Sequence, residues 1–332
     1  MPLNPYPFAL PRPGAAIEPP KPPIVGPSEA FFTEAFGPLL PPARFLETGH
    51  GKAAYYELPP SHQNLELTSS PRRVLLIHGV QTPALGMLPL ARALQASFPS
   101  AHFVLFDHWG HGLSDTPVLP HEPSLFHTLI DTLLDKLEWT CAHLVGFSFG
   151  GALTMGYVAS RPSRVQSYTL VAPVGLIPPS VFSDVENSHL RGDTTEAEAR
   201  EWVLGWLEGG ELVVPQDWRE RVGRGEVVRP AVLKWQIQEH PGHMASVLAI
   251  IRDGGVSGSD TKFIEAVRTG LPSLAVLGGT DDVCTEKQLN EVGMLNVAVI
   301  PQVGHEVVRE RASEVAAFIS NFWTDLDKVS SG

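Results

Sequence analysis

From residue 44 onward, the chain alternates apolar runs of strand length with segments of helical periodicity. The apolar runs contain few polar positions, which is typical of strands buried on both faces of a parallel sheet. We expect strands at residues 52–58, 74–78, 103–107, 143–146, 167–172, 273–277 and 297–300. Helical patterns lie at 88–98, 124–137, 151–160, 286–291 and 312–323. The alternation predicts an α/β fold, in which a mostly parallel sheet carries helices on both faces.

Two segments break this pattern. Residues 176–269 are more charged, show helical periodicity at 196–207, and hold four of the seven tryptophans. We interpret them as a helical cap inserted over the carboxyl ends of the strands. Residues 1–43 contain 13 of the 31 prolines. Because proline removes a backbone hydrogen-bond donor, we expect these residues to form little regular structure and to act as a proline-rich N-terminal tail or strap. The core is then expected at residues 44–175 and 270–328.

Charge and apolar content limit the class of partner. The net charge of −12 argues against nucleic acid as a partner. No apolar run approaches the ~18 residues of a membrane span, and the N-terminus shows no apolar signal region, so we expect a cytoplasmic protein. Cys141 and Cys284 are expected at opposite ends of the sheet, beyond disulfide reach, and therefore reduced. A small-molecule substrate is expected, and a homodimer through the cap or the strap stays open.

A serine lies between two glycines in the stretch Gly146-Phe-Ser148-Phe-Gly150. The apolar run 142–145 precedes it, and mostly small or apolar residues follow to residue 159. A strand that enters such a turn and a helix of small residues that leaves it are the context of a nucleophile elbow. Small residues also relieve crowding around a strained serine backbone. We therefore expect Ser148 to be a catalytic nucleophile rather than a chance serine.

A serine nucleophile needs a base, and the base needs an orienting acid. The best base among the thirteen histidines is His305, which follows the last strand and precedes the last helix. The penultimate strand is followed by Asp281 and Asp282, and spacing from the strand end favours Asp281 as the acid. The resulting chain order of serine, acid and histidine is specific to one fold type.

A tetrahedral intermediate needs N–H donors that are already in position. One donor is expected to be the backbone N–H of Phe149, directly after the nucleophile. The other is expected from the loop after strand 74–78, with the Val80 N–H favoured and Gln81 in reserve. His78 is interpreted as a structural residue of that loop.

For the substrate pocket we name four candidate residues, although aromatic side chains more often serve packing. Its candidate residues are Gln81, Trp109, Trp202 and Trp206. Trp202 and Trp206 lie four residues apart, so they share one helix face, which is explained equally well as the apolar face of the cap.

Several motifs occur together in order along the chain. They are His78-Gly79, the DHWGHGLSD stretch at 107–115, GFSFGG at 146–151, GGTD at 278–281 and Gly304-His305. Together they resemble the α/β-hydrolase superfamily over residues 44–325. The resemblance implies an eight-stranded sheet, a catalytic triad and an oxyanion hole, and it implies no particular substrate. The segment 234–243, together with 78–83, is similar to a group of largely uncharacterised fungal members.

The leading hypothesis is a serine hydrolase that cleaves an ester, lactone or thioester of a small hydrophobic molecule through an acyl-enzyme on Ser148. A carbon–carbon bond hydrolase of the β-diketone type would use the same triad. The third hypothesis is a non-catalytic ligand receptor on this fold, since receptors derived from such hydrolases can retain the catalytic triad. Epoxide hydrolases are disfavoured because they use aspartate where Ser148 stands. We expect no cofactor and no metal, because the glycine-rich turn of the family explains Asp107, His108 and His111 better than a metal site does.

Overall fold

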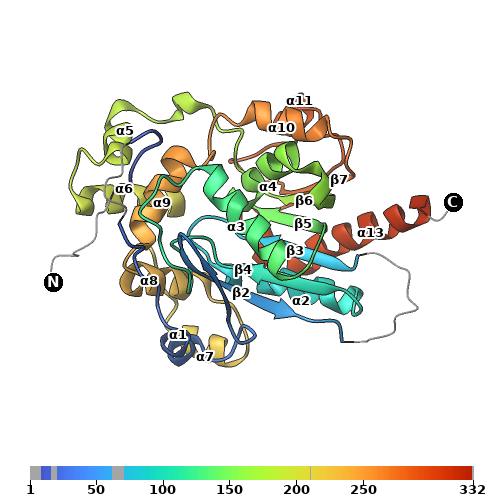
Figure 1. Cartoon of the computed structure of the whole chain (residues 1–332), viewed down its shortest axis with the longest axis horizontal. Coiled ribbons are helices and arrows are strands. Elements are labelled where there is room, and N and C mark those ends of the chain that lie inside the picture. Colours follow the sequence, from blue (N-terminus) through green and yellow to red (C-terminus); the bar gives the residue numbers. More distant parts are fainter. Residues whose placement is uncertain (1–8, 16–20, 62–70, 210, 331–332) are drawn as a thin grey trace.

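The computed structural model describes residues 9–15, 21–61, 71–209 and 211–330 (Figure 1). One sheet contains eight strands in the order β1-β2-β4-β3-β5-β6-β7-β8. Their bounds are β1 Arg44–Thr48, β2 Gly51–Leu58, β3 Arg73–Ile77, β4 His102–Phe106, β5 Ala142–Phe147, β6 Val165–Val171, β7 Ser273–Gly278 and β8 Val297–Ile300. The β1–β2 and β2–β4 pairs are antiparallel and the other pairs are parallel. The predicted mostly parallel, eight-stranded sheet is thus confirmed.

Strand β1 is absent from the strands expected from the sequence, because it lies at the edge of the sheet. Of its side chains only Leu46 is buried, while Arg44 and Glu47 are exposed. An edge strand with one buried side chain has too few apolar positions to produce a recognisable alternation.

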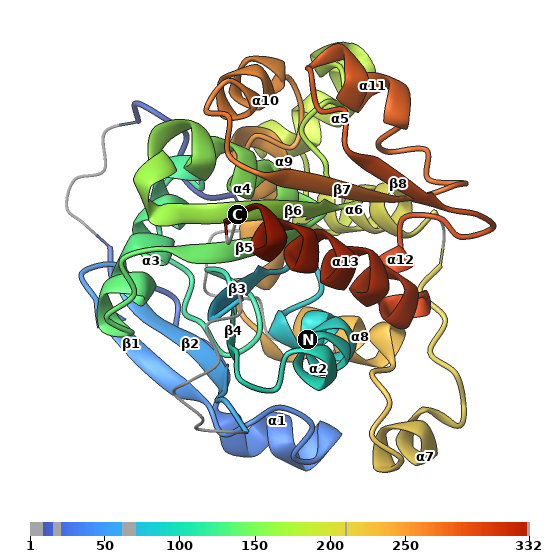
Figure 2. The same cartoon turned by 90° about the vertical axis from the view of Figure 1, so that its right-hand side faces the viewer.

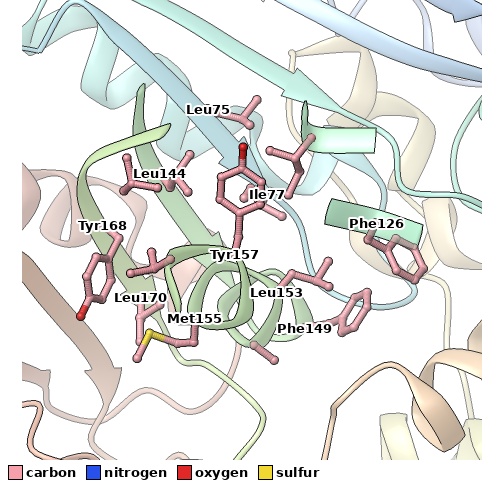
Figure 3. Packing of buried hydrophobic residues seen from close by; sticks show 14 of the residues in the cluster. Leu75, Ile77, Phe126, Leu144, Phe149, Leu153, Met155, Tyr157, Tyr168 and Leu170 are labelled. Carbon is pink, nitrogen blue, oxygen red and sulfur yellow. The ribbon is translucent and has the colours of Figure 1, made fainter. Parts of the chain in front are cut away.

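Helices cover both faces of the sheet (Figure 2). On one face lie α3 (Pro123–Lys136), α4 (Phe149–Ser160), α10 (Asp260–Val267) and α11 (Glu286–Glu291). On the other lie α2 (Leu88–Ser97), α12 (Val307–Glu310) and α13 (Ala312–Ser330). Successive strand residues alternate between the two apolar cores: Leu75 and Ile77 face α4 (Figure 3), whereas Val74 and Leu76 face α2. Both strand faces are apolar because both are covered.

Between β6 and β7 the chain forms a helical insertion. Its helices are α5 (Asp184–Arg191), α6 (Glu196–Glu208), α7 (Trp218–Gly223), α8 (Arg229–Glu239) and α9 (His243–Asp253). Ser183 and Thr195 form capping boxes at the starts of α5 and α6, which fixes where these two helices begin. Helix α10 follows and packs against α4, so it covers the sheet although it lies within residues 176–269.

Helix α1 (Glu29–Phe36) packs against the insertion rather than against the sheet alone. The ring of Trp235 in α8 lies 5.3 Å from that of Phe32 and 6.0 Å from that of Phe36. Ser28 accepts a hydrogen bond from the Phe31 N–H and so caps the helix. This cap fixes where α1 begins.

The segments before α1 run along helix α9. Leu10 and Ile24 are buried in one small apolar cluster with Ala249. The guanidinium of Arg252 donates hydrogen bonds to the carbonyls of Leu10 and Pro11. Residues 1–8 and 16–20 of the predicted tail lie outside the described residues. Within the described part of the chain, no helix combines the length and the apolarity that crossing a bilayer requires.

Eight of the histidines that the structure describes are buried, and burial lowers the pKa of each of them, that of His78 and His111 included. Burial lowers the pKa of His121 and His243 to about 3, and that of His108, His127, His143 and His240 to about 4. The side chain of His127, for example, donates from Nε2 to the Leu153 carbonyl at 3.0 Å. Burial disfavours the charged imidazolium, so each of these groups resists protonation in the folded state.

These histidines predict a loss of stability in mild acid. The unfolded chain binds protons near pH 6.5 while the folded chain does not, so stability present at neutral pH falls as the pH drops below about 6.5. Between pH 7 and pH 5.5 each buried histidine costs about 1 kcal/mol. Urea unfolding at these two pH values measures the loss. His127→Gln removes one titrating group and is expected to reduce the loss by about 1 kcal/mol; an unchanged loss would contradict this account.

Candidate active site

Ser148 lies in a sharp turn between β5 and α4, with φ 52° and ψ −117°. A left-handed φ is strained for a residue with a side chain, so the surroundings must hold it. The Ser148 N–H donates to the Val171 carbonyl at 3.1 Å, and the Ser148 carbonyl accepts from the Val174 N–H at 3.1 Å. Both partners belong to the end of β6 or the loop after it, so the neighbouring strand supports the turn.

Glycines let helix α4 pack closely enough to form this turn. A Cβ on Gly150 would lie 2.1 Å from the Ile77 carbonyl oxygen, and one on Gly146 would lie 2.4 Å from the Gly150 oxygen. Both clashes involve backbone atoms, which cannot rotate away as a side chain could. The spacing of glycines around Ser148 is therefore a steric requirement of the crossing between β5, β3 and α4.

The predicted base and acid lie beside Ser148. His305 Nε2 is 2.9 Å from Ser148 Oγ, and His305 Nδ1 is 3.1 Å from Asp281 Oδ2. The Asp281 side chain is 0% exposed, whereas that of His305 is 26% exposed. These distances allow Nδ1–H to donate to the carboxylate and leave Nε2 free to accept the serine proton.

The structure brings Asp281, and not Asp282, to the histidine. The second oxygen of Asp281 accepts the Val283 N–H at 2.9 Å, so the carboxylate is held at both oxygens. Asp282 is exposed and lines the adjoining cavity. A Cβ on Gly278 would lie 2.3 Å from the Gly304 oxygen, so a glycine at the end of β7 lets the aspartate and histidine loops approach each other.

The loop after β3 passes directly beside the serine. A Cβ on Gly79 would lie 2.9 Å from Ser148 Cβ, and Val80 lines the same cavity as Ser148 and Phe149. The Phe149 N–H belongs to the first turn of α4, where N–H groups have no partner within the helix. Across residues 9–15, 21–61, 71–209 and 211–330, neither this N–H nor that of Val80 has a hydrogen-bond acceptor. Both predicted oxyanion donors are thus unoccupied.

Gln81, the reserve donor, is already engaged. Its N–H donates to His111 Nε2 at 3.1 Å, and its side chain is buried. The structure therefore leaves the Val80 N–H as the donor from this loop that is available to a substrate. His78 bonds within the same loop region, from Nδ1 to the Gly79 carbonyl at 2.6 Å, in agreement with its structural interpretation.

Ser148 and His305 open into a cavity of about 560 Å³. Its apolar lining residues, here called the apolar wall, are Val80, Phe149, Val174, Ile177, Val181, Trp206, Leu207, Ile251, Val256 and Val283. Its charged lining residues, here called the charged edge, are Glu208, Arg229, Asp282 and Glu306. The volume suits a small molecule. A second cavity of about 540 Å³, between α1, α7 and α8, contains none of these side chains.

Of the predicted pocket residues, Trp206 lines this cavity and the other three do not. Trp109 is fully buried, with its carbonyl accepting from the Ser246 hydroxyl. Trp202 stacks on His189 at 5.5 Å between ring centroids, one turn farther from Ser148 along α6. Gln81 is buried and does not line the cavity. Sequence spacing predicts a shared helix face but not how far along the helix the cavity extends.

A charged group at the cavity edge was absent from the sequence predictions. Arg229 of α8 makes a bidentate ion pair with Glu208 of α6 and lies 3.5 Å from Glu306. Arg309 pairs with Glu306 on the other side. Burial alone would raise the pKa of Glu306, but the charges of Arg309 and Arg229 outweigh it and hold that pKa below its ordinary value. No sequence spacing connects these residues, which come from three separate segments.

The loop with Asp107 is held by hydrogen bonds to its carboxylate. The Asp107 carboxylate accepts from the Tyr56 hydroxyl and from the N–H groups of Ala84 and Leu113. Among the residues that the structure describes, no cluster of three or more His, Cys, Asp or Glu side chains is arranged to hold a metal ion.

The close crossing at Gly150 predicts a stability change. Gly150→Ala would place a methyl group against backbone oxygens and is expected to destabilise the protein by about 1–3 kcal/mol or more. Gly205→Ala is the matched control, since it lies inside α6 with open space around it, and is expected to stabilise by about 0.5–1 kcal/mol. Urea unfolding compares the two; equal stabilities would refute the steric explanation.

Comparison with known proteins gives relatives of the same architecture. Residues 72–206 match a family model described as the alpha/beta hydrolase fold. A dihydrolipoyllysine-residue acetyltransferase component of an acetoin cleaving system from Pseudomonas putida is 26% identical over 64% of this chain and 53% of its own length. A monoacylglycerol lipase from Xenopus laevis is 22% identical over 78% of this chain and 77% of its own. The chain thus spans about half of the first relative.

A solved structure agrees at the level of the fold. The enol-lactonase from Burkholderia xenovorans superposes with a TM-score of 0.62 at 18% identity, over 85% of this chain and 100% of that one. The likeness to fungal members stays a prediction. The eight-stranded sheet, the turn at Ser148 and the matched family model lead to one assignment: the chain has the α/β-hydrolase fold.

Proposed function

We propose that this protein is a serine hydrolase that cleaves an ester, lactone or thioester of a small hydrophobic molecule. The observation that carries the proposal is the continuous contact from Ser148 Oγ through His305 to Asp281. The match of residues 72–206 to the alpha/beta hydrolase family model supports a hydrolase. Two of the compared proteins, an enol-lactonase and a monoacylglycerol lipase, are named for lactone and ester chemistry, which supports that substrate class.

In the first half of the reaction, His305 Nε2 takes the Ser148 proton as Oγ attacks the carbonyl carbon. Asp281 holds the Nδ1–H tautomer and stabilises the imidazolium. The N–H groups of Val80 and Phe149 donate to the oxyanion that forms. When the carbon–oxygen or carbon–sulfur bond breaks, His305 returns the proton to the leaving group, and the acyl group stays on Ser148.

In the second half, water replaces the leaving group. His305 takes a proton from the water as its oxygen attacks the acyl-enzyme, and the same two N–H groups stabilise the second oxyanion. Collapse releases the carboxylic acid, and the proton on His305 returns to Ser148.

The two sets of lining residues support an apolar acyl group rather than an anionic one. The apolar wall can bury a chain or ring, because burial of apolar surface is favourable. The charged edge holds three carboxylates, Glu208, Asp282 and Glu306, and one guanidinium, Arg229. A negatively charged substrate would meet a net negative edge there, so neutral substrates are favoured.

We also propose the division of the chain expected from the sequence. Residues 176–269 would act as the cap, because α6, α8 and α9 supply side chains to the cavity. Residues 1–43 would act as a strap, supported by the contacts of Arg252 with Leu10 and Pro11.

An activated Ser148 is tested first by labelling. A fluorophosphonate probe is expected to label the wild-type protein and to leave Ser148→Ala unlabelled, because an activated serine Oγ displaces fluoride from the probe and forms a phosphonate ester. Short and medium p-nitrophenyl esters are expected to be hydrolysed by the wild type, with kcat at least about a thousandfold lower in the variant. Circular dichroism confirms that the variant is folded.

Two other outcomes of the labelling and turnover experiments would favour the two alternative functions. Labelling without ester turnover would overturn the ester assignment and favour carbon–carbon cleavage. Tight binding of small esters with neither labelling nor turnover would favour a ligand receptor.

The choice of acid is tested by two neighbouring variants. Asp281→Asn removes the charge that holds the His305 tautomer and is expected to lower kcat by about 10³–10⁴-fold. Asp282→Asn removes a charge of the same sign one residue away and is expected to change kcat by less than about threefold. Steady-state ester hydrolysis measures both, and equal losses would refute the assignment of Asp281.

A further inference from the structure

The backbone beside the candidate oxyanion donor Val80 is held in an unusual conformation. The next residue, Gln81, has φ 69°, a left-handed value that a glutamine does not adopt without support. Its N–H donates to His111 Nε2 at 3.1 Å. His111 can accept there because its other nitrogen, Nδ1, bonds the Trp109 carbonyl at 3.0 Å. One side of the Gln81 backbone is thus fixed by the core.

The other side is fixed by the insertion. Gln236 of α8 donates from Nε2 to the Gln81 carbonyl, and its Oε1 accepts the Gly112 N–H at 2.7 Å. The side chain is 0% exposed, so water cannot replace either bond. One amide therefore connects the backbone of the oxyanion loop to the glycine-rich loop, although Gln81 lies 155 residues and Gly112 124 residues before it in the sequence.

Two neighbouring hydrogen bonds hold the segment around Gln236 against the glycine-rich loop. His240 Nε2 bonds the Ser114 carbonyl at 2.8 Å, and His243 Nδ1 bonds the Gly110 carbonyl at 2.9 Å. Both histidines follow Gln236 in the insertion, and both bond the loop that contains Gly112. The stretch that contains Gln236, His240 and His243 is therefore an extended contact between the insertion and the glycine-rich loop.

We propose that Gln236 is a positioning residue of the oxyanion hole: its amide holds the Gln81 carbonyl so that the Val80 N–H stays aimed at the oxygen of the reacting carbonyl. The inference rests on the proposed function, since it needs Ser148 chemistry to act upon. Without the Gln236 amide, the Gln81 carbonyl would be buried and unpaired. The peptide group between Gln81 and Thr82 would then rotate toward another hydrogen-bond partner. A donor that moves by even 1 Å loses much of its effect on the transition state.

The test compares Gln236→Met with Gln238→Met. Methionine matches the length of glutamine but cannot make either hydrogen bond, and Gln238 is an exposed residue of the same helix. For Gln236→Met we expect kcat for a p-nitrophenyl ester to fall about 10- to 100-fold, with KM within about twofold, because the lost interaction acts in the transition state. Gln238→Met is expected to match the wild type in both constants.

A thionoester of the same alcohol separates positioning from a general structural defect. Its sulfur is larger and accepts hydrogen bonds weakly, so a hole built for oxygen helps it little. The wild-type ratio of ester to thionoester turnover is expected to collapse in Gln236→Met, because only ester turnover depends on the Val80 donor. Equal losses for both substrates would overturn the proposal and indicate a structural role.

Failures of the two proposals are distinguishable. A wild-type protein without labelling or turnover would refute the proposed function, whereas an active wild type with an unchanged Gln236→Met would refute only the role of Gln236. If Gln236→Met does not fold, Gln236→Asn answers the same question. Its amide keeps the polarity of the site but is one methylene shorter, so it cannot bond the Gln81 carbonyl and the Gly112 N–H together as glutamine does. The same loss of kcat and of the substrate ratio is expected, and wild-type values would refute the role.

Discussion

The structure of the site depends on one strained backbone turn, the left-handed conformation of Ser148 between β5 and α4. Such a conformation costs on the order of 1–3 kcal/mol and persists only where the surroundings hold it. Here β6 holds it by hydrogen bonds from either side of the serine, and the glycines let α4 approach β3 without a clash. The turn aims Oγ out of the sheet, where the loops after β7 and β8 bring Asp281 and His305 to it.

Around that turn, the insertion does more than line the cavity. Helices α8 and α9 bind the core through buried polar groups, including Gln236, His240 and His243, as well as through apolar contacts. Hydrogen bonds have directional requirements that apolar packing lacks, so they define where α8 lies relative to the oxyanion loop. The pair of Arg229 with Glu208 adds a charge-assisted contact at the cavity edge. Helix α8 therefore both lines the cavity, through Arg229, and contacts the loop that carries the proposed oxyanion donor Val80, through Gln236.

Much of the fold could be predicted because local patterns report burial directly. Apolar runs located seven of the eight strands, and the glycines around Ser148 located the turn. Chain order indicated His305, and distance from the strand end indicated Asp281, which the structure brings to His305. The prediction from sequence failed for Trp109, Trp202 and the edge strand β1. Whether an aromatic ring is buried, and whether a strand lies at the sheet edge, depends on neighbours that are distant in sequence.

The sequence by itself determined the α/β alternation, the position of the serine turn and the residue types that surround it, because each of these follows from local sterics and from the periodicity of apolar side chains. Only the tertiary structure decided which lining residues of the cavity each insertion helix supplies, and that Gln236 meets Gln81 and Gly112. The charged edge formed by Glu208, Arg229 and Glu306 likewise joins three distant segments. Such contacts arise from how buried polar groups pair in the folded chain, and pairing partners far apart in sequence leave no local pattern from which they can be predicted.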